Sequence, residues 1–141
     1  MAGCIFCKIV EGKLPSDRLY EDDRVVAFWD ANPTAPIHVL IVPRKHVATL
    51  NDLPEDDPIL SHIGEVAKIV AKKLGVAESG YRFMINVNKG GGQVIFHLHA
   101  HVIAGTDMGV RLIKFAILLA STWKRIKNKL TGGPKRPRTP K

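Results

Sequence analysis

The chain has 141 residues, 45% of them hydrophobic, which fits one globular domain. It lacks the basic start and apolar block of a signal peptide, and no apolar run is long enough to cross a bilayer, so a soluble cytoplasmic protein is the default expectation. The net charge of +8 is uneven: residues 1–110 hold 11 basic and 13 acidic residues, whereas residues 111–141 hold 10 basic residues and no acid.

Hydrophobic periodicity and turn residues predict an α+β fold with an antiparallel sheet, one short and one long helix. The expected elements, in chain order, are a helix over 4–11, strands over 18–20, 24–29 and 37–42, a helix over 56–75, a strand over 81–87 and a last strand through 96–103. We expect residues 1–110 to form one domain. The basic extension over 111–141 should be helical at first and disordered after residue 131.

Three of the six histidines fall within five consecutive positions, at i, i+2 and i+4. In a strand, alternate side chains point to opposite faces, so this spacing places His97, His99 and His101 on one face. The alternating apolar residues would pack into a core on the other face: Phe96, Leu98, Ala100 and Val102.

Three imidazoles on one face suit metal binding, attack on a phosphate, or an inert polar surface. The glycines at 90–92 precede them and would expose backbone N–H groups without side chains in the way. Such groups favour an anion over a metal, so the pattern indicates phosphate chemistry.

The segment His97-Leu98-His99-Ala100-His101-Val102-Ile103 resembles the signature of the histidine-triad (HIT) superfamily, and the preceding Gly-Gly-Gln is similar to its nucleotide-binding, Hint-like branch. The resemblance runs from about Cys4 to Gly105. It implies a HIT-like fold and a homodimer paired through the long helix and a strand. It also implies hydrolysis of nucleoside phosphoramidates, with purine nucleotides as substrates and a nucleotidyl-histidine intermediate. Dinucleoside polyphosphate hydrolysis and a nucleotide-binding scaffold are the alternatives.

The resemblance also assigns the catalytic residues. His99 would be the nucleophile, and His101 would donate a proton to the leaving group. His38 would support them, although by itself it reads as a buried structural histidine.

Further positions would hold the nucleotide. Asp30 would bind the ribose hydroxyls, although its plain reading is a loop cap. Phe28 and Leu40 would enclose the base, and the remaining phosphate-side positions are Asn86, Gly92, Gln93 and Val94. Val94 departs from the serine that purine-preferring relatives often carry, and valine cannot donate a hydrogen bond.

The pair Cys4-x-x-Cys7 reads equally as two small core thiols or as half of a metal site. The resemblance adds His46 and His97 and implies a structural zinc, with no metal needed for catalysis. His62 on the long helix reads as a surface residue. The basic extension would contact an anionic membrane or nucleic acid, or remain solvated without a target.

Overall fold

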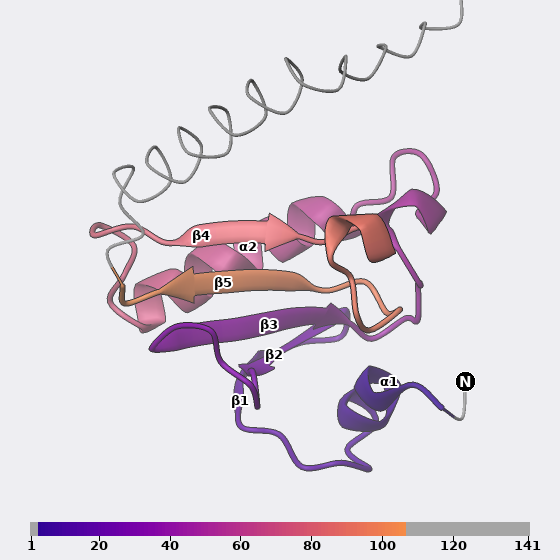
Figure 1. Ribbon diagram of the computed structural model, residues 1–141, viewed down its shortest axis with the longest axis horizontal. Helices are drawn as coiled ribbons and strands as arrows, with labels where there is room; N and C mark the ends of the chain where they lie inside the picture. The colour runs from indigo at the N-terminus through magenta and orange to yellow at the C-terminus, as the bar shows by residue number, and fades with distance from the viewer. Residues whose placement is uncertain (1–2, 107–141) are drawn as a thin grey trace, which may run out of the picture. The chain divides into compact units, whose positions relative to one another are not determined.

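The computed structural model describes residues 3–106 (Figure 1). Its elements are α1 (Ile5–Val10), β1 (Arg18–Glu21), β2 (Val25–Trp29), β3 (Ile37–Pro43), the 3-10 turn η1 (Leu50–Asp52), α2 (Ile59–Lys73), β4 (Arg82–Ile85), the 3-10 turn η2 (Lys89–Gly91) and β5 (Ala100–Ala104). All strand pairs are antiparallel, in the order β1-β2-β3-β5-β4. The predicted α+β fold is confirmed. The basic extension over 111–141 lies outside the described residues.

The two faces of the sheet are covered by different helices. One face carries Val39, Ile41 and Val102, which form a core with Ile63 and Val66 of α2. The opposite face carries Val26, Phe28, Leu40 and Val42, which pack against Phe6 and Val10 of α1. Because a strand alternates its side chains, β2 and β3 each contribute to both cores.

The helix α2 follows from its apolar spacing and its end signals. Asp57 accepts a hydrogen bond from the N–H of Ile59 in the first turn, and Gly75 ends the helix at a φ of +71°. Its buried side chains lie on one stripe, whereas Ile69 is 47% exposed. Among residues 3–106, no helix is long and apolar enough to cross a membrane.

The expected last strand is shorter than predicted. Ladder pairing begins at Ala100, so His97 and His99 lie in the segment before β5 and only His101 belongs to the strand. Alternation still holds for Leu98, which is buried in the α2 core. It fails for Phe96, which is 48% exposed, because a segment without ladder hydrogen bonds is not bound to the period of a strand.

Candidate active site and metal-binding cluster

A cleft of about 580 Å³ opens on the α1 face of the sheet, within the range of small-molecule sites. We call it the histidine cleft. Strand register explains its floor, because Phe28 pairs with Leu40 and Leu40 pairs with His101, which places the three side chains in one row. The cleft brings together eight of the predicted residues: Phe28, Asp30, Leu40, Asn86, Gly92, Val94, His99 and His101.

His99 is held in one tautomer at the floor of the cleft. Its Nδ1 donates a hydrogen bond to the backbone oxygen of His97 at 2.7 Å, so Nε2 carries the free lone pair. Burial lowers the pKa of His99, although that hydrogen bond opposes the change. The ring of Phe6 packs edge-on against it, with centroids 5.1 Å apart. A neutral, oriented imidazole of this kind is a competent nucleophile.

His101 is oriented by His38, which lies behind it. The backbone N–H of Thr34 donates to Nδ1 of His38 at 3.1 Å, so Nε2 of His38 carries a proton and donates to Nδ1 of His101 at 2.9 Å. Asp30 Oδ2 lies 3.3 Å from the same Nε2. His38 therefore does not line the cleft but fixes the ring of His101, as the resemblance implies for a supporting histidine.

The outer nitrogen of His101 is the most informative atom of the cleft. With Nδ1 accepting from His38, Nε2 must carry a proton, yet this buried atom has no hydrogen-bond partner among the described residues. Burial, followed by the neighbouring His99 and His38, lowers the pKa of His101 to about 4. A buried donor without an acceptor is costly, and a bound anion would satisfy it.

The glycine loop differs from the expectation that its amides face an anion. The N–H groups of Gly91 and Gln93 both donate to the oxygen of Asn88, and that of Gly92 donates to Lys89. These bonds close the η2 turn, which Gly92 ends at a φ of +84°. The loop therefore shapes the cleft, and these three amides hydrogen-bond within the loop itself.

Gln93 also departs from its expected role on the phosphate side. Its side chain is 3% exposed, and its amide donates to the oxygens of Ala48 and Ile95 while accepting from the N–H of Asn88. All of these partners are backbone groups, so Gln93 fastens the loop to the domain. Among residues 3–106, the N–H groups of Gly90 and Val94 have no acceptor, and of these two residues Val94 lines the cleft, so its amide is available to a ligand there.

Two further polar residues, Asp30 and Ser16, line the cleft, and sequence reasoning missed the second. Asp30 Oδ1 accepts from the N–H of Asn32 at 2.9 Å, which confirms a loop-capping contact and leaves Oδ2 toward His38. Ser16 also lines the cleft, and its buried Oγ has no partner among the described residues. Ser16 gave no sequence signal because serine is common in turns.

A second cluster joins the four predicted metal ligands. The Sγ of Cys4 lies 3.4 Å from His97 Nδ1, and Cys7 Sγ lies 3.2 Å from His46 Nδ1. The two Nδ1 atoms are 3.2 Å apart, and all four donor atoms lie within 4.8 Å of one another. Ligands at ordinary Zn–S and Zn–N bond lengths in a tetrahedron are about 3.3 to 3.8 Å apart, so the set fits zinc.

The tautomer of His97 supports the same conclusion. Its Nε2 donates to the backbone oxygen of Pro43 at 2.8 Å, which leaves the Nδ1 lone pair directed at the cysteines. His97 is fully buried, and burial lowers its pKa, so the ring is neutral as a ligand must be. The ring of His97 thus faces the cysteine cluster, and its backbone oxygen holds the ring of His99.

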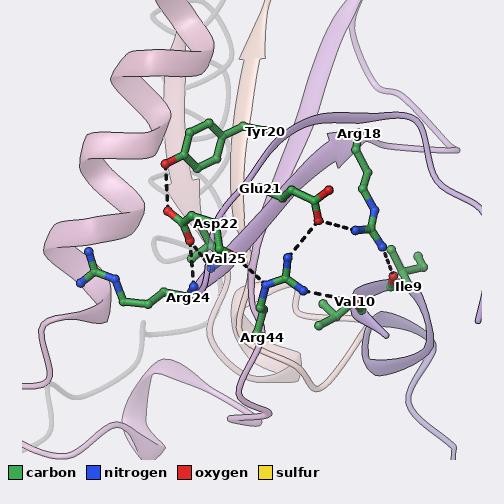
Figure 2. A network of polar contacts seen from close by, with 9 residues as sticks. All are labelled: Ile9, Val10, Arg18, Tyr20, Glu21, Asp22, Arg24, Val25 and Arg44. Atoms are coloured by element: carbon green, nitrogen blue, oxygen red, sulfur yellow. Dashed lines mark hydrogen bonds and ion pairs between the residues drawn. The ribbon is translucent and has the colours of Figure 1, made fainter. Parts of the chain in front are cut away.

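Helix α1 connects this cluster to the cleft and is fixed at both ends. Its first turn carries the two cysteines, and Figure 2 shows Arg18 and Arg44 donating to the oxygens of Ile9 and Val10 at its last turn. Glu21 accepts from both arginines and keeps them in place. Such contacts satisfy carbonyl groups that a helix end leaves open.

His62 is not the plain surface residue that was predicted. Its Nε2 donates to Asp22 Oδ2 at 2.6 Å, and Arg24 donates to its Nδ1. Asp22 also accepts from Tyr20 and from the N–H groups of Arg24 and Val25, as Figure 2 shows in part. Burial opposes ionisation of Asp22, but these donors hold its pKa well below the usual range. The network ties the β1–β2 turn to α2, away from the cleft.

The chain is similar to known proteins over most of its length. The HIT domain family model matches residues 11–108. Purine nucleoside phosphoramidase of Escherichia coli strain K12 is 42% identical over 109 residues, which are 77% of this chain and 92% of that protein. The structure of a HIT family hydrolase from Legionella pneumophila Philadelphia 1 is 45% identical, with a TM-score of 0.74 over 77% of this chain and 97% of that one. A zinc-bound histidine triad family protein from Mycobacterium smegmatis is 29% identical, with a TM-score of 0.68 over 77% and 79% of the two chains.

Proposed function

Because this chain belongs to the HIT domain family, we propose that it is a nucleotide hydrolase that cleaves the bond between the α-phosphorus and the leaving group of nucleoside phosphoramidates or related nucleotidyl substrates. The observation that carries the proposal is the pair of tautomers on the cleft floor. His99 presents a free Nε2 lone pair, and the adjacent ring of His101 presents an unpartnered Nε2 proton. A nucleophile beside a proton donor is the minimum machinery for a displacement at phosphorus.

In the first step, Nε2 of His99 attacks the phosphorus and the P–N bond breaks. The departing nitrogen takes the proton of His101 Nε2, and His101 Nδ1 takes the proton that His38 holds in their 2.9 Å hydrogen bond. This relay needs a second proton on His38, at Nδ1, where the structure has the Thr34 N–H donating. That proton would replace the Thr34 N–H contact and donate instead to the Thr34 hydroxyl, 3.3 Å away, while Asp30 Oδ2 lies 3.3 Å from Nε2 and balances the added charge. The amine leaves neutral, and the nucleotide remains on His99.

In the second step, the proton relay runs backward. His101 now has a free Nε2, which accepts a proton from the attacking water and returns its Nδ1 proton to His38. The new P–O bond replaces the bond from phosphorus to His99, which releases a nucleoside monophosphate and restores the starting proton arrangement. His101 thus acts first as an acid and then as a base.

The rest of the cleft supplies binding. Phe28 and Leu40 offer an apolar floor for the base of a purine nucleotide, and Asp30 offers a carboxylate to the ribose hydroxyls. On the phosphate side, Asn86 and the free N–H of Val94 are the available donors. Gly92 leaves room there because it has no side chain.

The test is the variant His99→Asn, which keeps a polar side chain but removes the attacking nitrogen. It should bind a nucleoside monophosphate yet lose turnover of a nucleoside phosphoramidate by at least about three orders of magnitude. Rapid quench of the wild-type protein with labelled substrate should trap the nucleotide on His99. Near-normal turnover by the variant would refute the hydrolase and leave the nucleotide-binding scaffold as the better account.

A structural zinc at Cys4, Cys7, His46 and His97 forms the second part of the proposal, supported by the donor distances and the His97 tautomer. When bound, the metal would fix α1 and His97, and it takes no part in the displacement. Both thiols are free in the structure and must stay reduced to bind metal, which suits a cytoplasmic location.

A homodimer is the third part. Phe83 of the edge strand β4 is 42% exposed and shares the α2 face of the sheet, because it pairs with Val102. Ile69 of α2 is 47% exposed. These apolar residues suit a contact with a second copy.

The basic extension remains a proposed contact for anionic membrane or nucleic acid, which salt-sensitive binding to vesicles or polynucleotide would measure.

A further inference from the structure

A second groove adjoins the histidine cleft, and three residues line both: Ile5, Val94 and Ile95. We call it the apolar groove. Its other lining residues are Gly3, Cys4, His46, Ala48 and Phe96. Among the described residues, no lysine, arginine, aspartate or glutamate lines it. A ligand that extends from the cleft can therefore enter this groove without meeting a lysine, arginine, aspartate or glutamate side chain.

The groove is bordered by apolar side chains that the fold leaves in water. Val94 is 86% exposed, Phe96 48% and Ile5 46%, and these are three of the six large hydrophobic residues exposed in the described part of the chain. Scattered exposed hydrophobic residues need no explanation, but a contiguous group beside a polar cleft indicates a binding surface.

The geometry of the displacement indicates which part of the substrate lies in the apolar groove. In a displacement at phosphorus, the attacking and leaving atoms lie roughly in line on opposite sides. His99 is 6% exposed, so a leaving group opposite its Nε2 must point out of the cleft. Val94 lines that cleft and is almost fully exposed, so it stands where an outgoing group can contact it.

We propose that the apolar groove is the leaving-group subsite, and that it selects nucleoside phosphoramidates whose amine carries an apolar chain. The proposal rests on the hydrolase function argued above and specifies its substrate class. An apolar chain would cover Val94 and Phe96 and remove their surface from water. A polyphosphate leaving group would bring several negative charges to walls that carry no lysine or arginine to pair with them, which disfavours dinucleoside polyphosphates.

The experiment compares two phosphoramidates of one nucleoside, made from hexylamine and from 6-aminohexanol. Both have the same P–N bond and chain length, and they differ only in a terminal hydroxyl group. The wild-type protein should prefer the hexyl substrate by about tenfold in kcat/KM, the low end for an apolar subsite because the groove is open to water. A dinucleoside polyphosphate should be the poorest substrate of the three.

Val94→Ser and Phe96→Ser should each reduce this preference at least about threefold. Leu60→Ser is the matched control, because Leu60 is an exposed apolar residue of α2 that lines neither cleft nor groove. It should leave the preference unchanged. Equal kcat/KM for both amidates in the wild type, or an unchanged preference in both groove variants, would overturn the subsite.

A binding measurement separates this inference from the hydrolase proposal. Calorimetry with the hexyl and 6-hydroxyhexyl esters of the nucleoside monophosphate reports the groove without turnover. If no amidate is cleaved but the hexyl ester binds more tightly, the groove does bind an apolar chain, but the hydrolase fails and with it the leaving-group role. If both amidates are cleaved equally and both esters bind equally, the hydrolase stands and the subsite is wrong.

Discussion

At the scale of single residues, hydrogen-bond partners decide which nitrogen of each histidine carries a proton. The three histidines of the signature have three different partners: a backbone oxygen for His99, His38 for His101, and the Pro43 oxygen together with two thiols for His97. Each partner selects one tautomer and thereby one chemical role. In the proposed mechanism, the same type of side chain would thus act as nucleophile, proton donor and metal ligand within five positions.

Ser16 offers a prediction at this scale. Its buried hydroxyl has no partner among the described residues and faces the cleft, so a bound nucleotide should satisfy it. Ser16→Ala should raise KM about three- to tenfold, the value of one hydrogen bond. It should leave kcat nearly unchanged, because a hydroxyl that binds the ground state and the transition state equally does not alter the rate of the displacement. Ser79→Ala, at an exposed serine outside the cleft, is the control. A fall in kcat at constant KM would contradict a binding role.

At the scale of elements, α1 is a short helix held by contacts outside itself. Six residues are too few for a stable isolated helix, so its position depends on the cysteine cluster at one end and on Arg18 and Arg44 at the other. Between these ends, Ile5, Phe6 and Ile9 form one wall of the histidine cleft. Loosening either end should therefore weaken nucleotide binding.

The two ends give separable predictions. Cys7→Ser should lower zinc content from about one per chain and lower Tm, because a lost ligand opens the metal site. Arg44→Ala should keep the zinc but still raise the Kd for a nucleoside monophosphate about two- to fivefold, since Val10 and Glu21 lose their partner. Metal analysis, thermal melts and calorimetry on both variants distinguish the two effects. Unchanged Tm in zinc-free Cys7→Ser would count against a structural metal.

At the scale of the whole molecule, the proposed function gives the two faces of the sheet different roles: the face covered by α2 would serve assembly, and the face covered by α1 would serve chemistry. Phe83→Arg should shift the protein from dimer to monomer in light scattering, because it places a charge in an apolar contact. Phe96→Arg is the matched control: it alters an equally exposed phenylalanine beside the apolar groove and should leave the mass unchanged. A monomeric wild-type protein would contradict the proposed dimer.

Stability should fall in mild acid because His101 is buried in its neutral form. Its pKa is lowered to about 4 in the folded chain, against roughly 6.5 when unfolded, so between these values the unfolded chain binds more protons. The stabilisation is complete above pH ~6.5 and is lost as the pH falls to about 4, at up to about 1.4 kcal/mol per pH unit.

Denaturant unfolding across this range, at equal zinc content, measures the slope for wild type and His101→Gln. The variant lacks the titrating group and should show the shallower dependence. The readout is the slope, which a uniform loss of stability in the variant does not change. Equal slopes would mean that His101 does not titrate in this way.

The sequence by itself determined the α+β order, the two helices, the family and most of the residues that meet in the cleft and the metal cluster. Periodicity and spacing are local properties of the chain, so the sequence alone predicts which side chains share a face of a strand. Phe28, Leu40 and His101 meet in the structure because strand alternation places them on one face. The four metal ligands were recognised through the family pattern, and their donor atoms do converge.

Only the tertiary structure decided how those residues are used. The loop amides of Gly91 and Gly92 close a turn, Gln93 binds backbone oxygens, and Phe96 faces water, all contrary to expectation. Hydrogen-bond acceptors such as the backbone oxygens of Pro43 and Ala48 come from segments distant in sequence. The local sequence around His97 and Gln93 therefore does not predict them. The histidine tautomers, the unpartnered Nε2 of His101 and the continuity of cleft and groove all arise from tertiary packing. Each depends on which groups from distant segments lie within hydrogen-bonding or packing distance in the folded chain.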